Sequence, residues 1–245
     1  MDNTALILVQ EQSDSSNTTI YSFYLIDLST ASCVLVSTNL TKSSTSPKLK
    51  TLGSHQGKFY LLSQVNLFTC DPRTGSINLV GTLASSNSAI SRNTIAIDSS
   101  NEVISLSTQT NSSPPNTLTF NSVDTYQGKF SKIVSVSSKS GPVSCNALTF
   151  DSHDYLYGTF SPSPTSDNST PDDILAFVYP SGGALTTQKI ISITSYNQVN
   201  GLLFSNDILY GITQTGKLIS IDPFSGKINK IGDTGLTVLG MCSLD

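Results

Sequence analysis

Charged residues are scarce in this sequence. Of its 245 residues 12% are charged, the formal net charge is -4, and Arg73 and Arg92 are its two arginines. Proteins that bind DNA or RNA contact the phosphate backbone through clusters of lysine and arginine, and no such cluster occurs here. We therefore exclude nucleic acid from the expected partners.

Long apolar runs are missing as well. A helix that crosses a bilayer needs about 20 consecutive apolar residues, and no stretch of the chain approaches this length. Residues 1–4 lack the basic segment that opens a secretory signal. We therefore expect a soluble, cytoplasmic protein without a membrane partner.

Cysteines are few and far apart. Cys33, Cys70, Cys145 and Cys242 include no C-x-x-C pair, which argues against a zinc ribbon or a redox site. Residues 160–173 hold three aspartates among oxygen-bearing neighbours, but they lack the ligand spacing and the glycine of an EF-hand loop. We expect reduced thiols, no metal and no cofactor, and we interpret residues 160–173 as a loop rich in proline and serine.

What the sequence does contain is a repeat of short strand signals, separated by turns of glycine, aspartate and serine. The clearest copy spans residues 201–232 and has four apolar strands. Copies of the same pattern begin near residues 49, 94 and 147. The N-terminal copy, residues 6–36, supplies only three strands, and residues 239–245 match its missing inner strand.

The spacing of the copies closes on itself. Equivalent second-strand positions are separated by 53, 44, 53 and 53 residues, and the step from the last of them through the chain ends back to the first is 42. These positions are Ile7, Tyr60, Ile104, Tyr157 and Tyr210. Four strands in about 40 to 50 residues is typical of a propeller blade. The sequence therefore predicts an all-β fold, a five-bladed β-propeller with four antiparallel strands per blade, whose first blade is closed by the C-terminal strand; residues 1–245 form a single domain.

Other all-β folds explain the repeat less well. A sandwich has no reason to repeat one four-strand pattern five times, and a solenoid would not divide one repeat between its two ends. The predicted closure also buries Leu239, Met241 and Leu244 in the first blade.

One segment carries a family resemblance. The sequence Leu209-Tyr210-Gly211, followed by Leu218 and by Ile221-Asp222-Pro223 with Gly226, resembles the L-Y-G...L-x-x-I-D-P-x-x-G signature of large β-propeller repeat families. The likeness is good in the blades that end at Gly232 and Gly81 and weaker in the other three. The resemblance implies the fold and no particular activity.

Repeated aspartates are the first candidates for chemistry. Asp27, Asp71 and Asp222 end the third strand of their repeats, and two of them open Asp-Pro turns, so we interpret them as acceptors of backbone N–H bonds. Five-bladed glycosidases resemble one another in placing acidic residues along the inner strands, whereas these inner strands carry acids only at their far ends. A glycoside hydrolase or lyase is therefore the least favoured alternative, and we lean towards no enzyme.

Two other ligand chemistries are weighed. His55 and His153, with Asp154, offer donors for a metal, but they belong to non-adjacent blades and are interpreted as exposed turn residues. Sugar binding usually needs aromatic faces, and the chain has no tryptophan, while its repeated tyrosines lie mid-strand and are expected to pack between blades. Carbohydrate binding, as in a lectin, is the second alternative.

The site prediction rests on a repeated asparagine. Asn93, Asn146 and Asn200 stand at the start of three inner strands, with Gly240 at this position in the closing blade, and Arg92 directly precedes the first of them. Inner strands converge on the channel, so these side chains either bond neighbouring backbone or together bind a ligand. Long loops at 10–19, 107–117 and 160–173 share this face. We predict a non-catalytic binding or interaction module that uses the channel mouth and the loop face; the partner is an unknown protein or a small polar or carbohydrate ligand.

Overall fold

The computed structural model describes residues 3–12, 19–41, 48–55, 57–63, 66–82, 90–98, 100, 102–109, 117–137, 143–162, 173–181, 184–193, 195–196 and 198–244. Within these ranges the regular structure is all β-strand. None of the described residues belongs to a helix that could span a membrane.

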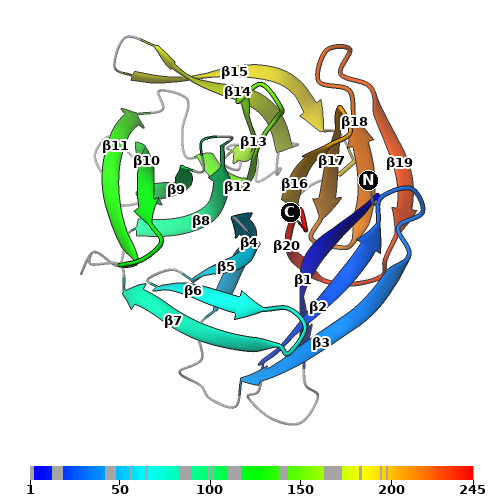
Figure 1. The fold of residues 1–245 in the computed structure, drawn as a ribbon. Helices are drawn as coiled ribbons and strands as arrows, with labels where there is room; N and C mark the ends of the chain where they lie inside the picture. Colours follow the sequence, from blue (N-terminus) through cyan, green and yellow to red (C-terminus); the bar gives the residue numbers. More distant parts are fainter. Residues whose placement is uncertain are drawn as a thin grey trace.

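The strands form five antiparallel sheets of four strands, arranged as a ring of blades (Figure 1). Blade 1 consists of β20 (Val238–Cys242), β1 (Thr4–Gln12), β2 (Thr19–Asp27) and β3 (Cys33–Thr41). Blade 2 consists of β4 (Leu49–His55), β5 (Lys58–Ser63), β6 (Asn66–Asp71) and β7 (Ser76–Thr82). Blade 3 consists of β8 (Ile90–Ile97), β9 (Val103–Gln109), β10 (Thr117–Asp124) and β11 (Lys129–Ser137). Blade 4 consists of β12 (Val143–Phe150), β13 (Leu156–Pro162), β14 (Asp173–Ser181) and β15 (Ala184–Ile193), and blade 5 of β16 (Val199–Ser205), β17 (Ile208–Thr213), β18 (Lys217–Ile221) and β19 (Ile228–Asp233). The predicted five-bladed propeller is confirmed.

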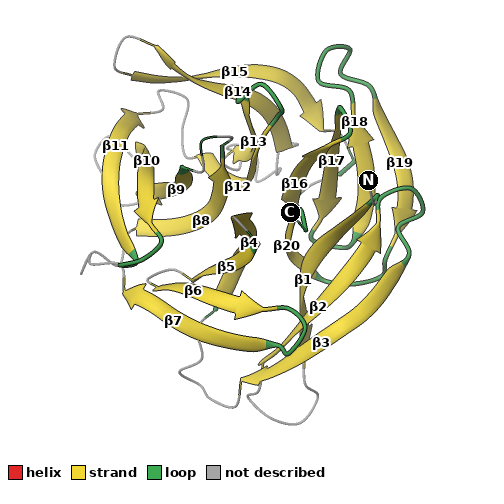
Figure 2. Cartoon of the chain, in the orientation of Figure 1, coloured by secondary structure: helices red, strands yellow, loops and turns green. Residues whose placement is uncertain are grey.

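The first blade joins the two ends of the chain. The C-terminal strand β20 is the inner strand of this blade and pairs antiparallel with β1, with Ile7 opposite Met241 (Figure 2). The Gln10 N–H donates to the Thr237 carbonyl at 2.9 Å and extends the pairing beyond the strand. The predicted closure is confirmed, but only Met241 of the three expected residues is fully buried, because Leu239 is half-buried and Leu244 is 38% exposed.

The core lies between the blades. Among the described residues, buried side chains form five clusters, one at each interface between neighbouring blades. Tyr60, Tyr157 and Tyr210 are buried in three of these clusters, as predicted. Alternating strand residues thus face the next blade, and the inner strands are left to surround the channel.

The aspartates that end third strands hold turns. The Asp222 carboxylate accepts the backbone N–H of Phe224 at 2.9 Å, and the Asp71 carboxylate accepts that of Arg73 at 2.9 Å. Asp27 bonds the backbone of its turn in the same way. Hydrogen bonds from the Ser225 side chain and from the turn backbone lower the pKa of Asp222 below 3.8. The turn interpretation is confirmed.

Candidate functional site

Each inner strand contains a β-bulge at the same position. Near the start of each inner strand, one residue has no partner on the second strand, while the residues before and after it are paired with consecutive residues of that strand. A bulged residue is added to one strand without a partner on the other, which redirects its side chain. The bulged residues are Lys50, Asn93, Asn146, Asn200 and Leu239. We call them the bulge layer.

Burial indicates where the bulge layer points. Lys50 is exposed and Asn146 and Asn200 are half-exposed, although the residues before and after each of them in the strand are buried. An inner strand is paired along one edge, and its other edge faces the channel (Figure 1). The exposed parts of these side chains therefore lie at the end of the ring where the inner strands begin.

The structure describes the side chains of two of the four predicted site residues, Asn146 and Asn200. Asn146 and Asn200 belong to the bulge layer, as does the backbone of Asn93, with Arg92 one residue before it. The side chains of Arg92 and Asn93 lie outside the part of the chain whose side chains are described. In the closing blade the bulge falls at Leu239, one residue before the expected Gly240.

Both described asparagines have structural partners. The Asn200 amide nitrogen donates to the Val238 carbonyl at 3.0 Å, which ties blade 5 to the closing strand. The Asn146 amide nitrogen donates to the Ser161 hydroxyl at 2.6 Å, within its own blade. These contacts hold each amide against neighbouring protein groups, and the Asn200 contact agrees with the backbone-bonding explanation.

Lys50 adds a cation that the repeated-asparagine prediction missed. It occupies the bulge of blade 2, in the same layer as Asn146 and Asn200. Although the side chain is exposed overall, partial loss of water around its ammonium lowers the pKa below 10.5, and repulsion from Lys48 lowers it further. Lys50 could have been found from its position in the repeat, because it precedes Leu52 by two residues as each asparagine precedes the equivalent apolar residue of its blade. Its residue type gave no such indication.

An apolar layer lies behind the bulge layer. One side chain from each inner strand, two residues beyond the bulge, is buried: Leu52, Ile95, Leu148, Leu202 and Met241. These residues line a cavity of about 80 Å³, which has room for a few water molecules. The bulge layer is therefore backed by a layer of buried apolar side chains.

The chemistry of the bulge layer suits an anion or a hydroxyl group. A calcium site uses six to eight oxygen ligands, with carboxylates among them, and this layer supplies an ammonium group, amides and a leucine. The layer therefore does not fit a divalent cation. Among all described residues, no group of three or more His, Cys, Asp or Glu side chains is placed to hold a metal ion.

Other sequence candidates lie elsewhere. His153 is an exposed turn residue whose Nδ1 lies 3.3 Å from the Ser152 hydroxyl. The side chain of His55, and residues 163–172 of the aspartate-containing loop, lie outside the described residues. The second strands β1, β9 and β13 end at the bulge face, so the loops that follow them begin there, as predicted.

Comparisons with known proteins show the fold. No protein-family model matches the chain, and no curated protein matches it either. Among solved structures, a protein of unknown function from Bacteroides thetaiotaomicron is 14% identical to this chain, with a TM-score of 0.53. The match covers 91% of this chain and 57% of that protein, so this chain spans little more than half of its length. A candidate gluconolactonase is 11% identical with a TM-score of 0.54, over 97% of this chain and 80% of that one. A calcium-binding protein, regucalcin from Agrobacterium tumefaciens, is 14% identical with a TM-score of 0.49, over 92% of this chain and 73% of that one. At 14% and 11% identity, the first two similarities show that the chain shares its fold with these two proteins.

Proposed function

We propose that the chain is a binding protein that holds a small, anionic, polyhydroxylated ligand at the channel mouth without transforming it. The observation that carries this proposal is the position of Lys50 in one layer with Asn146 and Asn200. A few convergent polar groups over an apolar floor are typical of small-molecule sites.

Each group has a separate part in this proposal. The Lys50 ammonium pairs with a carboxylate or phosphate, since it is a compact cation with three donors. Asn200, whose amide nitrogen is held by Val238, turns its Oδ1 towards a ligand hydroxyl. Arg92, if it faces the mouth as predicted from the sequence, adds a second cation.

The apolar floor limits the size and direction of the ligand. Because the cavity behind the bulge layer measures only about 80 Å³, the ligand enters from the bulge face and stays there. Its outer side then faces the ends of the second strands β1, β9 and β13, where a larger polar ligand would extend.

The test compares two polyols that differ in charge. D-gluconate carries a carboxylate, and sorbitol is a neutral polyol of the same length. By isothermal titration, we expect gluconate to bind about tenfold more tightly than sorbitol, and Lys50→Gln to remove most of that difference. Lys230→Gln, on the exposed outer strand β19, removes the same charge far from the channel and should change nothing. Equal affinity for both polyols, or an unchanged affinity in Lys50→Gln, would contradict the proposal.

The enzyme alternative has its own readout. The similarity to a candidate gluconolactonase motivates a pH-stat assay with glucono-1,5-lactone. A binding protein leaves the rate of hydrolysis at its spontaneous value. Hydrolysis that rises in proportion to protein concentration, and that falls in Lys50→Gln, would replace the binding proposal with an enzymatic one.

A further inference from the structure

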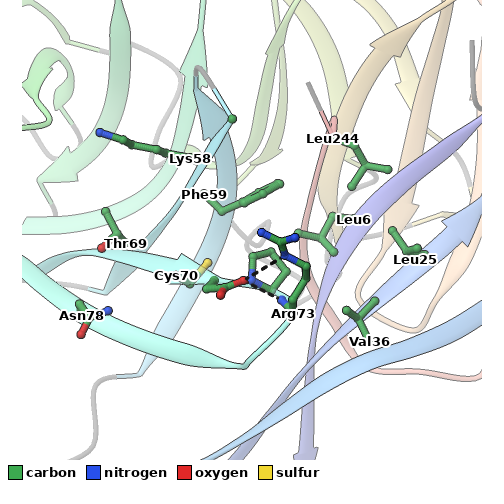
Figure 3. Close-up of a pocket in the computed structure, with 13 residues that line it drawn as sticks. Leu6, Leu25, Val36, Lys58, Phe59, Thr69, Cys70, Arg73, Asn78 and Leu244 are labelled. Atoms are coloured by element: carbon green, nitrogen blue, oxygen red, sulfur yellow. Dashed lines mark hydrogen bonds and ion pairs between the residues drawn. The ribbon is translucent and has the colours of Figure 1, made fainter.

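A second cavity lies on the opposite face of the ring, between blades 1 and 2 (Figure 3). It has a volume of about 730 Å³, within the range of sites for small organic molecules. It opens beside the β4–β5 and β6–β7 turns, whereas the bulge layer lies at the other end of the inner strands. We call it the Arg73 cleft.

The body of the Arg73 cleft is apolar. Leucine, valine and phenylalanine side chains from both blades line it: Leu6, Leu25, Val36, Phe59 and Leu244. Cys70 also lines the cleft, and burial raises the pKa of its thiol to about 12, so the sulfur stays neutral. An apolar ligand body that fills this space gains about 0.8 kcal/mol for each methylene removed from water.

Arg73 brings a cation to the cleft. Its side chain is 90% exposed, and its Nε lies 3.9 Å from Asp71 Oδ1, a long contact. The Asp71 carboxylate meanwhile accepts the Arg73 backbone N–H at 2.9 Å, so the turn is fixed beneath the guanidinium group. In Figure 3 this group lies between the side chains of Phe59 and Leu6, and Arg73 is one of the residues that line the cleft.

The other nearby cation points away. The Lys58 ammonium lies 5.9 Å from the centre of the Tyr126 ring in blade 3, and in Figure 3 its side chain extends to the far side of the cleft from Leu25 and Val36. Arg73 is therefore the cation that a ligand in the cleft meets. Its planar fork suits a carboxylate, which it binds through two parallel hydrogen bonds.

The same fold element provides an internal comparison. An equivalent cleft of about 490 Å³ lies between blades 4 and 5, beside the turn that begins at Asp222. In that cleft Phe224, which is 91% exposed, occupies the position in the repeat that Arg73 has in blade 2, and Ile208 occupies the position of Lys58. An arginine at this position is thus found in one of the two clefts and is not a requirement of the Asp-Pro turn.

We propose that the Arg73 cleft binds amphipathic carboxylates, with the apolar chain of the ligand between blades 1 and 2 and its carboxylate on the Arg73 guanidinium group. A medium-chain fatty acid or an aromatic acid has this chemistry. The site is independent of the proposed function at the channel mouth, because it lies on the other face and shares none of its residues.

The test uses a tryptophan reporter, because the chain contains no tryptophan. Leu244→Trp places an indole at the rim of the Arg73 cleft, and Ile208→Trp places one at the equivalent cleft between blades 4 and 5. We expect octanoate to shift the emission of the first variant and not of the second. Affinity should rise about two- to fourfold per methylene from hexanoate to decanoate.

The charge is tested separately. Adding Arg73→Gln to the reporter should weaken octanoate about tenfold and leave octan-1-ol unchanged. Lys227→Gln, an exposed lysine beside the Phe224 turn, serves as the charge-matched control and should have no effect. Titration calorimetry of octanoate with the unmodified chain checks that the introduced indole does not itself fill the cleft.

The proposal would be overturned by equal binding of octanoate and octan-1-ol, by unchanged octanoate affinity in Arg73→Gln, or by no octanoate binding to the unmodified chain at millimolar concentration. An equal shift in the Ile208→Trp reporter would also overturn it, since binding would then not depend on the cleft that carries the arginine.

Discussion

Deleting residues 238–245 removes the strand that closes the ring. The loss exposes the inner edge of β1, which in the intact chain pairs with β20 from Leu6 to Val9. An unpaired inner strand in an otherwise closed ring is a template for association with another chain. We therefore expect the truncated chain to unfold or to aggregate.

The magnitude follows from burial. Val238 and Met241 are 0% and 4% exposed, and Cys242 is also buried. At roughly 1.5 to 3 kcal/mol for each large apolar side chain, and less for cysteine, the deletion costs about 4 to 7 kcal/mol before any strand hydrogen bond is counted. A domain of ordinary stability has about 5 to 15 kcal/mol in total.

The assay is thermal unfolding by circular dichroism together with size-exclusion chromatography. Deletion of residues 244–245, which lie beyond β20, is the control and should keep the melting temperature within a few degrees of the full chain. A chain without residues 238–245 that is monomeric and melts at the full-length temperature would refute the closed-ring account.

Three further predictions concern the site and the turns. Asn146→Ala combined with Arg92→Ala should abolish gluconate binding in calorimetry and leave the melting temperature near the unmodified value; normal binding or outright unfolding would make these residues scaffolding only. Gluconate affinity should be lost as the pH rises through the Lys50 pKa, and thus below pH 10.5, because only the protonated ammonium attracts the anion; a flat profile up to that pH would speak against Lys50. Gly75→Ala should lower the free energy of unfolding, measured by denaturant titration, by more than Gly57→Ala does. Both glycines have positive φ, which costs alanine about 1 to 2 kcal/mol, but only a Cβ at Gly75 would meet backbone, at 2.8 Å. Equal losses in the two variants would contradict this explanation.

The blade pattern could be predicted because it depends on local signals. Strand alternation, Asp-Pro turns and the mid-strand tyrosines are visible in one sequence, and each of them has the predicted place in the structure. Closure could be predicted since the N-terminal copy lacks a strand that residues 239–245 supply.

The bulges and the clefts could not be predicted in the same way. A bulge shifts the register by one residue and leaves no mark in the sequence. Residue type therefore aligned Gly240 with the asparagines, whereas the bulged residue of the closing blade is Leu239. Lys50 was missed for the same reason: it occupies the equivalent bulge, but it is a lysine where blades 3, 4 and 5 have asparagine. The Arg73 cleft depends on side chains of two blades that meet only after the ring has closed.

The central claim is that the bulge layer is a ligand site, and side-chain and backbone amide shifts test it most directly. When gluconate is titrated into isotopically labelled protein, the NMR chemical shifts of Lys50, Asn146 and Asn200 should change along one saturation curve. The chemical shifts of Arg73 and Val36, which line the other cleft, should not change. Shifts confined to other parts of the chain, or none at saturating gluconate, would contradict the claim.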